Sequence, residues 1–268
     1  MGDGMEFKFK DQLSLGVASA ATQIEGGECG HNWNDWYAKG KIKDHSNPAR
    51  ATNHYHLWKQ DADLMAEMKI KYYRLGIEWA RICPKEGEVD EAAIAHYREE
   101  LIYLKEKSIS VLLTIHHFTN PMWFERKGAF TKKENLQYFL DFVELVVKSF
   151  GDLASEYITI NEPNVYATLS YYFGEWPPGE KSISKTVTVM SNMAICHMKA
   201  YRLIHRMREK MGFHDTKVSF ANHVRVFDPQ NPKNVLHGIC SKLLERLFQG
   251  VETYLAELQK IRYRDGVT

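Results

Sequence analysis

Cysteine is scarce in this chain and widely scattered. Only Cys29, Cys83, Cys196 and Cys240 occur among the 268 residues, and no two of them form a C-x-x-C pair. This spacing excludes the paired ligands of a structural zinc site and the dense framework of a disulfide-stapled domain. We therefore expect reduced thiols, a cytoplasmic protein and no metal site.

Long apolar runs are also absent. No uninterrupted apolar stretch approaches the roughly 20 residues that a membrane-spanning helix needs. Residues 1–12 are polar and charged, without the apolar segment of a secretory signal. We therefore expect neither a membrane helix nor a cleaved leader.

The chain has almost no net charge and no glycine motif for phosphate. Its formal charge is +1, so no bulk attraction to nucleic acid or to a membrane surface is expected. Neither G-x-G-x-x-G nor a P-loop occurs, so nothing cradles a nucleotide phosphate. We expect no cofactor, no nucleic-acid partner and no membrane partner.

The chain has enough apolar residues for one large hydrophobic core. Hydrophobic residues make up 44% of the sequence, and no linker or internal repeat divides it. We therefore expect a single domain over residues 1–268. Strand-like and helix-like patterns alternate: strands over 13–21 (buried), 71–76, 111–117, 157–162 and 217–222, and helices over 54–69, 91–107, 132–150, 184–211 and 234–249. This order predicts an α/β fold with a parallel sheet and right-handed crossovers.

A long polar and aromatic stretch separates the first strand from the first helix. It begins at Gly26-Gly27 and runs through Trp33 and Trp36 to about Ala51. A structureless connection of this length is uncommon in a compact domain, which favours a functional loop or lid.

A carboxylate stands at the tip of the fourth strand, in the segment Tyr157–Pro163. The β-branched run ends at Asn161-Glu162, because Pro163 cannot continue the ladder. In β/α chains the C-terminal end of a strand is where barrel enzymes place catalytic groups. The alternative is a glutamate at a solvated strand end, and Asn-Glu-Pro alone does not exclude it.

Arg74 lies near the tip of the second predicted strand. An arginine inside a barrel mouth needs a carboxylate partner, because an unpaired buried charge is costly. A structural salt bridge and a role at an active site are both compatible with this position.

Two histidines end the third predicted strand. His116 and His117 are followed by Phe118, Pro121 and Trp123, and aromatic rings suit the C–H faces of sugars. We interpret the group as a sugar-binding rim. A metal site is not indicated, because neighbouring strand residues point to opposite faces and no third ligand has suitable spacing.

Six segments together carry a resemblance to a known family. They are 20–26 (AATQIEG), 54–55 (HY), 74–82 (RLGIEWARI), 114–118 (TIHHF), 159–163 (TINEP) and 173–179 (FGEWPPG). Their order and spacing resemble the N-terminal part of glycoside hydrolase family 1, the β-glucosidase family, over residues 7 to about 249. The resemblance implies a (β/α)8 TIM barrel.

The resemblance also implies roles for individual residues. Glu162 would be the general acid/base, and Asn161 would donate to the sugar 2-hydroxyl. Gln23 and His117 would bind glycone hydroxyls, and Arg74 would lie beside the nucleophile and keep it ionised. The partner would be a β-glucoside or related sugar. Retaining glycosidases use two carboxyls about 5–5.5 Å apart, one as acid and one as nucleophile.

The chain departs from the family pattern in its second half. The Thr-Glu-Asn-Gly segment that holds the nucleophile does not occur, and neither do the later Trp-Ser-Leu and Asn-Phe-Glu-Trp segments. We therefore expect a partial barrel of about five parallel strands with outer helices. We expect hydrolysis by this chain alone to be weak or absent.

The last residues, 251–268, form an atypical C-terminal helix in our interpretation. They resemble the family's seventh helix and its approach to the eighth strand, which suggests an internal deletion near Gly250. The alternative is an unrelated terminal helix.

An open piece of barrel has two exposed strand edges and uncovered apolar faces. We expect a homo-oligomer, or a complementing chain that covers this surface. Three alternatives to hydrolysis stay open at this point: a carbohydrate-binding pseudoenzyme, a self-associating partial barrel without catalysis, and binding of another small molecule in the barrel centre.

Overall fold

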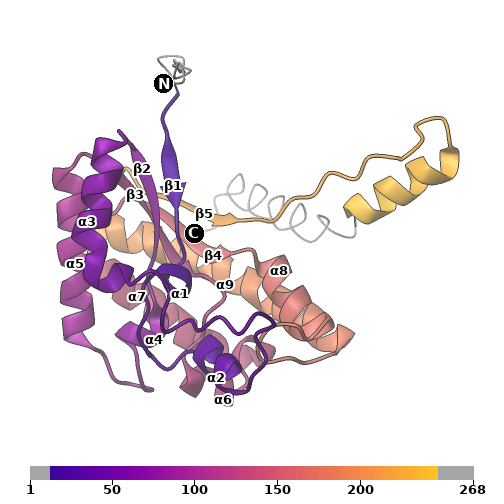
Figure 1. Cartoon of the computed structure of the whole chain (residues 1–268), viewed down its shortest axis with the longest axis horizontal. Coiled ribbons are helices and arrows are strands. Elements are labelled where there is room, and N and C mark those ends of the chain that lie inside the picture. Colours follow the sequence, from indigo (N-terminus) through magenta and orange to yellow (C-terminus); the bar gives the residue numbers. More distant parts are fainter. Residues whose placement is uncertain (1–12, 247–268) are drawn as a thin grey trace, which may run out of the picture.

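A five-stranded parallel sheet, with its strands in sequence order, is the centre of the protein (Figure 1). The computed structural model describes residues 13–246. The strands are β1 (Gly16–Ala18), β2 (Tyr72–Gly76), β3 (Ser110–His116), β4 (Glu156–Asn161) and β5 (Lys217–Ala221). Each strand pairs in parallel with the next. The predicted α/β class and the partial barrel of about five strands are confirmed.

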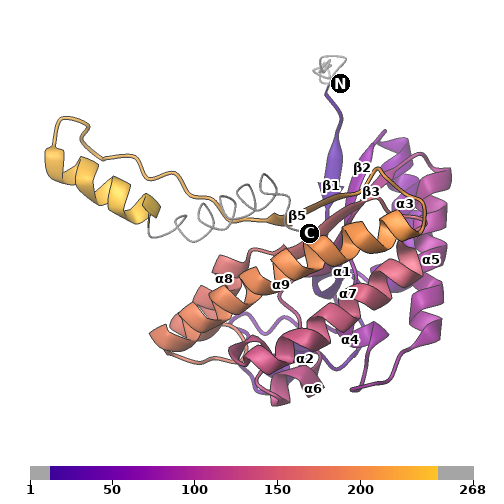
Figure 2. The same ribbon diagram turned by 180° about the vertical axis from the view of Figure 1, so that it is seen from behind.

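Four long helices return the chain between strands and cover one face of the sheet (Figures 1 and 2). They are α3 (His54–Glu67), α5 (Glu91–Glu106), α7 (Leu136–Phe150) and α9 (Ile183–Lys210). Short helices follow the C-terminal ends of the strands: α1 (Ala21–Ile24), α2 (Asn32–Ala38), α4 (Trp79–Ile82), α6 (Met122–Arg126) and α8 (Pro163–Ala167). Turns of 3-10 helix at Ala129–Thr131 and Lys133–Asn135 and a π-helical turn at Thr168–Tyr172 complete these connections.

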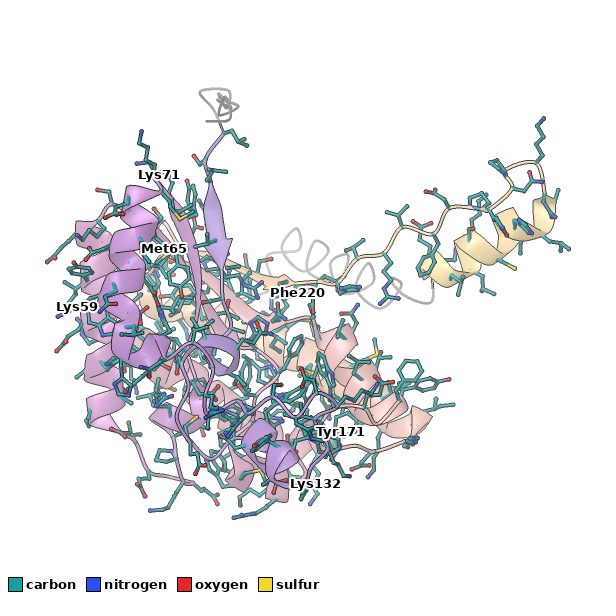
Figure 3. All side chains as sticks on the ribbon, viewed as in Figure 1. Lys59, Met65, Lys71, Lys132, Tyr171 and Phe220 are labelled. Atoms are coloured by element: carbon teal, nitrogen blue, oxygen red, sulfur yellow. The ribbon has the colours of Figure 1, made fainter. Side chains whose placement is uncertain are left out.

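The core lies between the sheet and the long helices, where side chains crowd together (Figure 3). On α7, Val143, Val147 and Phe150 are fully buried at helical spacing. Trp79 of α4 stacks on Phe142 with ring centroids 5.0 Å apart. Burying side chains of this kind stabilises the fold by about 1.5–3 kcal/mol each.

The first strand differs from the prediction. It covers only Gly16–Ala18, and its residues are exposed rather than buried. Within residues 13–246, β1 has a strand neighbour on one side alone, namely β2. A small apolar run indicates burial only when both sides of the strand are covered, so the expectation of a buried strand was wrong.

The expected loop up to Ala51 contains a helix, α2, which the sequence pattern did not indicate. His31 begins this helix, because its ring Nδ1 accepts hydrogen bonds from the backbone N–H groups of Trp33 and Asn34 at 3.2 Å each. Histidine is not among the favoured N-cap residues, so the helix start carried no recognisable signal. The helix places the aromatic residues of this stretch over the sheet's C-terminal edge.

The chain leaves the body of the protein after β5. A helix at 235–246 stands away from the sheet, and its side chains project beside no other described element (Figures 1 and 3). Its large apolar residues are exposed: Val235, Leu236, Ile239, Leu243 and Leu244. The helix expected over 251–268, and the suggested deletion near Gly250, lie outside the described residues. None of the helices within residues 13–246 is long and apolar enough to cross a membrane.

A buried histidine between two carboxylates joins α3 to α5. His54 is 4% exposed, with Nδ1 2.6 Å from Asp61 Oδ2 and Nε2 3.0 Å from Glu100 Oε1. Burial works to lower the pKa of His54, but the two carboxylates outweigh it and raise this pKa to about 9. The imidazolium is therefore part of the folded structure at neutral pH.

We predict that the fold loses stability as the pH rises through about 9. The folded-state pKa of His54 exceeds its ordinary value of 6.5, so its contribution is complete below the ordinary value and disappears as the pH passes the raised one. The contribution is on the order of 3 kcal/mol. Urea unfolding of the wild type and of His54→Asn across this range should converge at high pH. A constant difference between the two would contradict the assignment.

Candidate active site

The end of β4 holds the carboxyl that the sequence singled out. Glu162 adopts the left-handed backbone conformation, with φ 42° and ψ 61°. Its N–H still donates to the carbonyl of Ala221 at 2.7 Å, and Pro163 then begins α8. For a residue with a Cβ this conformation costs about 1–2 kcal/mol. Strain of this kind is typical of functional sites, so the carboxyl is held at the strand tip for a reason other than local preference.

Glu162 faces a histidine from the neighbouring strand connection. Nδ1 of His223 lies 3.4 Å from Oε1 of Glu162, and the two side chains are 35% and 29% exposed. The carboxyl is therefore partly exposed, with Oε1 beside an imidazole.

Arg74 on β2 joins three neighbouring strands through its hydrogen bonds. Its Nη2 donates to Oδ1 of Asn161 at 2.5 Å, and its Nε donates to Oγ1 of Thr114 at 3.0 Å. Burial lowers the pKa of Arg74, while the charge of Glu162 opposes that shift. Within residues 13–246 the guanidinium has no ion pair with a carboxylate. The structural salt bridge considered from the sequence is therefore not found in this part of the chain.

The two histidines after β3 have different surroundings. His116 is fully buried, and its Nε2–H donates to Oδ1 of Asn120 at 3.0 Å. His117 lies just past the strand, and its buried Nδ1 has no hydrogen-bond partner among the described residues. Burial first, and then the charge of Arg74, lower the pKa of His117 to about 3. A neutral imidazole of this kind can donate a hydrogen bond to a hydroxyl group or accept one from it.

A cavity of about 360 Å³ brings Gln23 and His117 together. Three aromatic rings line it as well, with Trp176 lying 5.4 Å from Trp33 and 4.8 Å from Phe118 between ring centroids. Each ring comes from a different connection after a strand. Trp33 and Trp176 were not predicted as site residues; their clustering in aromatic loops was the signal, but a loop pattern does not reveal which rings meet.

Trp123 does not line this cavity. Its indole N–H donates to the carbonyl of Cys83 at 2.9 Å, and its ring packs at 5.8 Å from Trp79 and 5.4 Å from Tyr138. The structure thus gives Trp123 a packing role beside the core. The interpretation of Trp123 as a substrate-binding residue is corrected, because α6 turns this side chain towards the core.

Three buried side-chain atoms that follow the ends of neighbouring strands have no hydrogen-bond partner within residues 13–246. They are Nδ1 of His117, Oδ1 of Asn164 and Oδ1 of Asn222. Buried polar groups are nearly always hydrogen-bonded, and exceptions call for an explanation. Of the three residues, His117 lines the cavity that Gln23 shares, so a hydroxyl group bound there would satisfy its Nδ1.

The C-terminal ends of the parallel strands hold a carboxyl, an amide and a neutral imidazole. This arrangement indicates a class of protein. This is an open segment of a (β/α)8 barrel with an enzyme-type site at the end where barrel enzymes carry out their chemistry. The sequence profile of glycosyl hydrolase family 1 matches residues 5–249, and the chain belongs to this family.

Individual relatives agree with this family and show how much of it is present. Beta-glucosidase A of Acetivibrio thermocellus is 32% identical over 206 residues, covering 74% of this chain and 46% of that protein. For beta-glucosidase A of Thermotoga maritima the identity is 29% over 233 residues, covering 84% and 51%. A beta-glycosidase structure from Pyrococcus horikoshii matches with a TM-score of 0.80 at 31% identity, covering 91% of this chain and 55% of that one. The chain therefore spans about half the length of these relatives, which confirms its resemblance to the family's N-terminal part.

We predict that Gln23 and His117 carry sugar binding. In Gln23→Ala and His117→Ala, the affinity for glucose or cellobiose should fall about 5-fold for each lost hydrogen bond, as measured by calorimetric titration. Trp123→Phe is the matched control, because it alters a ring outside the cavity and should leave the affinity unchanged. Equal losses in all three variants would contradict both the assignment and the correction for Trp123.

Proposed function

We propose that this chain supplies the proton-donating half of a retaining β-glucosidase site. The observation that carries the proposal is the strained Glu162 at the β4 tip, next to the hydrogen bond between Arg74 and Asn161. Relatives of the chain are named beta-glucosidases, and one from Thermotoga maritima has been solved in complex with glucoimidazole. A β-glucoside or related sugar is the proposed substrate.

Each side chain has a task that its surroundings support. Glu162 protonates the glycosidic oxygen as the bond to C1 breaks, and it takes a proton from water in the second step. Because Oδ1 of Asn161 accepts from Arg74, the Asn161 amide N–H groups are left to donate to the sugar 2-hydroxyl. Gln23 and neutral His117 bind hydroxyls of the glycone in the cavity that they share.

Within residues 13–246, no carboxylate that could attack C1 is paired with Arg74. The Arg74 guanidinium, whose pKa the charge of Glu162 works to raise, would stabilise an anion at this point. We propose that this chain alone hydrolyses glycosides weakly or not at all, because covalent catalysis needs a nucleophile on the opposite face of C1.

We predict that azide restores the missing step. In wild-type protein with an aryl β-glucoside, added azide should attack C1 from the face opposite to the aryl group, while Glu162 gives its proton to the departing oxygen. The product would be α-glucosyl azide, identified by NMR. Glu162→Gln should lower this rate about 100-fold or more for an aryl group that leaves poorly.

Glu67→Gln is the control for that experiment, because Glu67 is exposed at the end of α3. It should keep the wild-type rate. Fast hydrolysis without azide, with retention at C1, would show that the chain has a nucleophile of its own and would overturn this part of the proposal. Sugar binding without any azide product would instead indicate a carbohydrate-binding pseudoenzyme.

We also propose that the open barrel associates with a second copy of the chain or with a complementing chain. The proposal is supported by the free edges of β1 and β5 within residues 13–246 and by the exposed apolar residues of the helix at 235–246. Exposed edges and apolar patches of this kind favour association.

We predict that the wild-type protein is larger than a monomer in light scattering. The double variant Leu236→Glu, Leu243→Glu should shift it towards the monomer, because both side chains are exposed on the projecting helix. Lys242→Glu on the same helix is the control for added negative charge. A well-folded wild-type monomer would count against association.

The expected compartment stays a proposal. The four cysteines, Cys29, Cys83, Cys196 and Cys240, are all unpaired. Free thiols support a cytoplasmic location, because oxidising compartments favour disulfides.

A further inference from the structure

His223 is attached to the same short helix that begins at the candidate acid. Its carbonyl accepts a hydrogen bond from Nδ2 of Asn164 at 3.0 Å, and Asn164 lies on α8, two residues after Glu162. The backbone of Glu162 is in turn hydrogen-bonded to Ala221 at 2.7 Å. The two side chains that meet at 3.4 Å are thus positioned by a common framework rather than by a chance encounter of surface residues.

The ring nitrogens of His223 have different partners, and this difference sets the position of the proton. Nε of Arg225 donates to Nε2 of His223 at 3.0 Å. An arginine side chain can only donate, so Nε2 must accept, and the imidazole that does so is neutral with its proton on Nδ1. Nδ1 is the atom that faces Oε1 of Glu162.

We propose that Arg225 and His223 position the carboxyl of Glu162 for proton transfer. Arg225 holds His223 in the Nδ1–H tautomer, which places the ring proton on the nitrogen that lies 3.4 Å from Oε1. Oε2 is then the oxygen that carries the exchangeable proton towards the glycosidic oxygen and later accepts one from water. His223 is a positioning residue in this arrangement, because it acts through Glu162 and does not itself touch the sugar.

The contact between His223 and Glu162 orients the carboxyl group and adds little to the stability of the fold. Partly exposed polar pairs contribute little to stability, and the side chains of His223 and Glu162 are 35% and 29% exposed. A small displacement of a group that transfers a proton nevertheless slows the reaction greatly, because transfer requires hydrogen-bond distance. The role of Oε2 rests on the proposed function of Glu162, whereas the tautomer of His223 does not.

The test is the proton position, measured on labelled wild-type protein by two-bond ¹H–¹⁵N correlation of the histidine rings. We expect the Nδ1–H tautomer for His223 at neutral pH, and its loss in Arg225→Ala but not in Arg225→Lys. The carboxyl ¹³C resonance of Glu162 should shift in His223→Ala and stay near its wild-type position in His223→Asn, because the asparagine amide keeps an N–H donor. His214→Ala, an exposed histidine before β5, is the control and should leave both signals unchanged.

An Nε2–H tautomer in the wild type, or a Glu162 resonance that is indifferent to His223→Ala, would overturn the proposal. The wild-type tautomer needs no variant, so a variant that fails to fold does not weaken the test. The aryl β-glucoside assay in azide separates the two proposals. An Nδ1–H tautomer with no azide product would refute the proposed function and leave the pairing of His223 with Glu162 intact.

Discussion

The hydrogen bonds of the Arg74 guanidinium join three strands of the sheet. They reach from β2 to Thr114 on β3 and to Asn161 on β4, so one side chain aligns three neighbouring strands. The alignment is possible because parallel strands in sequence order end at the same edge of the sheet. The orientation of Asn161, and the placement of Glu162 directly after it, depend on this bridge.

The Arg74 hydrogen bonds also show that a carboxylate partner is missing from this part of the open barrel. Arg74 is half-buried and satisfied by neutral oxygen atoms, with no carboxylate paired to it in residues 13–246. Its positive charge is balanced only at longer range by Glu162, which opposes the effect of burial on the Arg74 pKa. Of the charged residues to which the family resemblance assigns catalytic roles, the described part of the chain holds Glu162 and Arg74.

Polar residues near strand ends could be recognised from the pattern, but their surroundings could not. His116 and His117 are adjacent in sequence and equally conspicuous, yet one packs in the core and hydrogen-bonds Asn120 while the other opens onto the cavity. Trp123 looked like part of a sugar-binding rim and instead packs beside Trp79. Successive residues at a strand end point to opposite faces, and a following helix can turn a side chain by any angle, so local spacing does not decide which group faces a ligand.

The sequence by itself determined the order of strands and helices, the family, and the position of Asn161 and Glu162 at the end of a strand. The order and the strand end follow from periodicity and from chain-breaking residues such as Pro163, which act locally, and the family follows from the resemblance of six short segments. Only the tertiary structure decided that Trp33 and Trp176 share a cavity with Gln23, that β1 is exposed, and that His223 meets Glu162. Those contacts join segments far apart in the chain, and their distances depend on how the helices pack against the sheet rather than on any pattern within one segment.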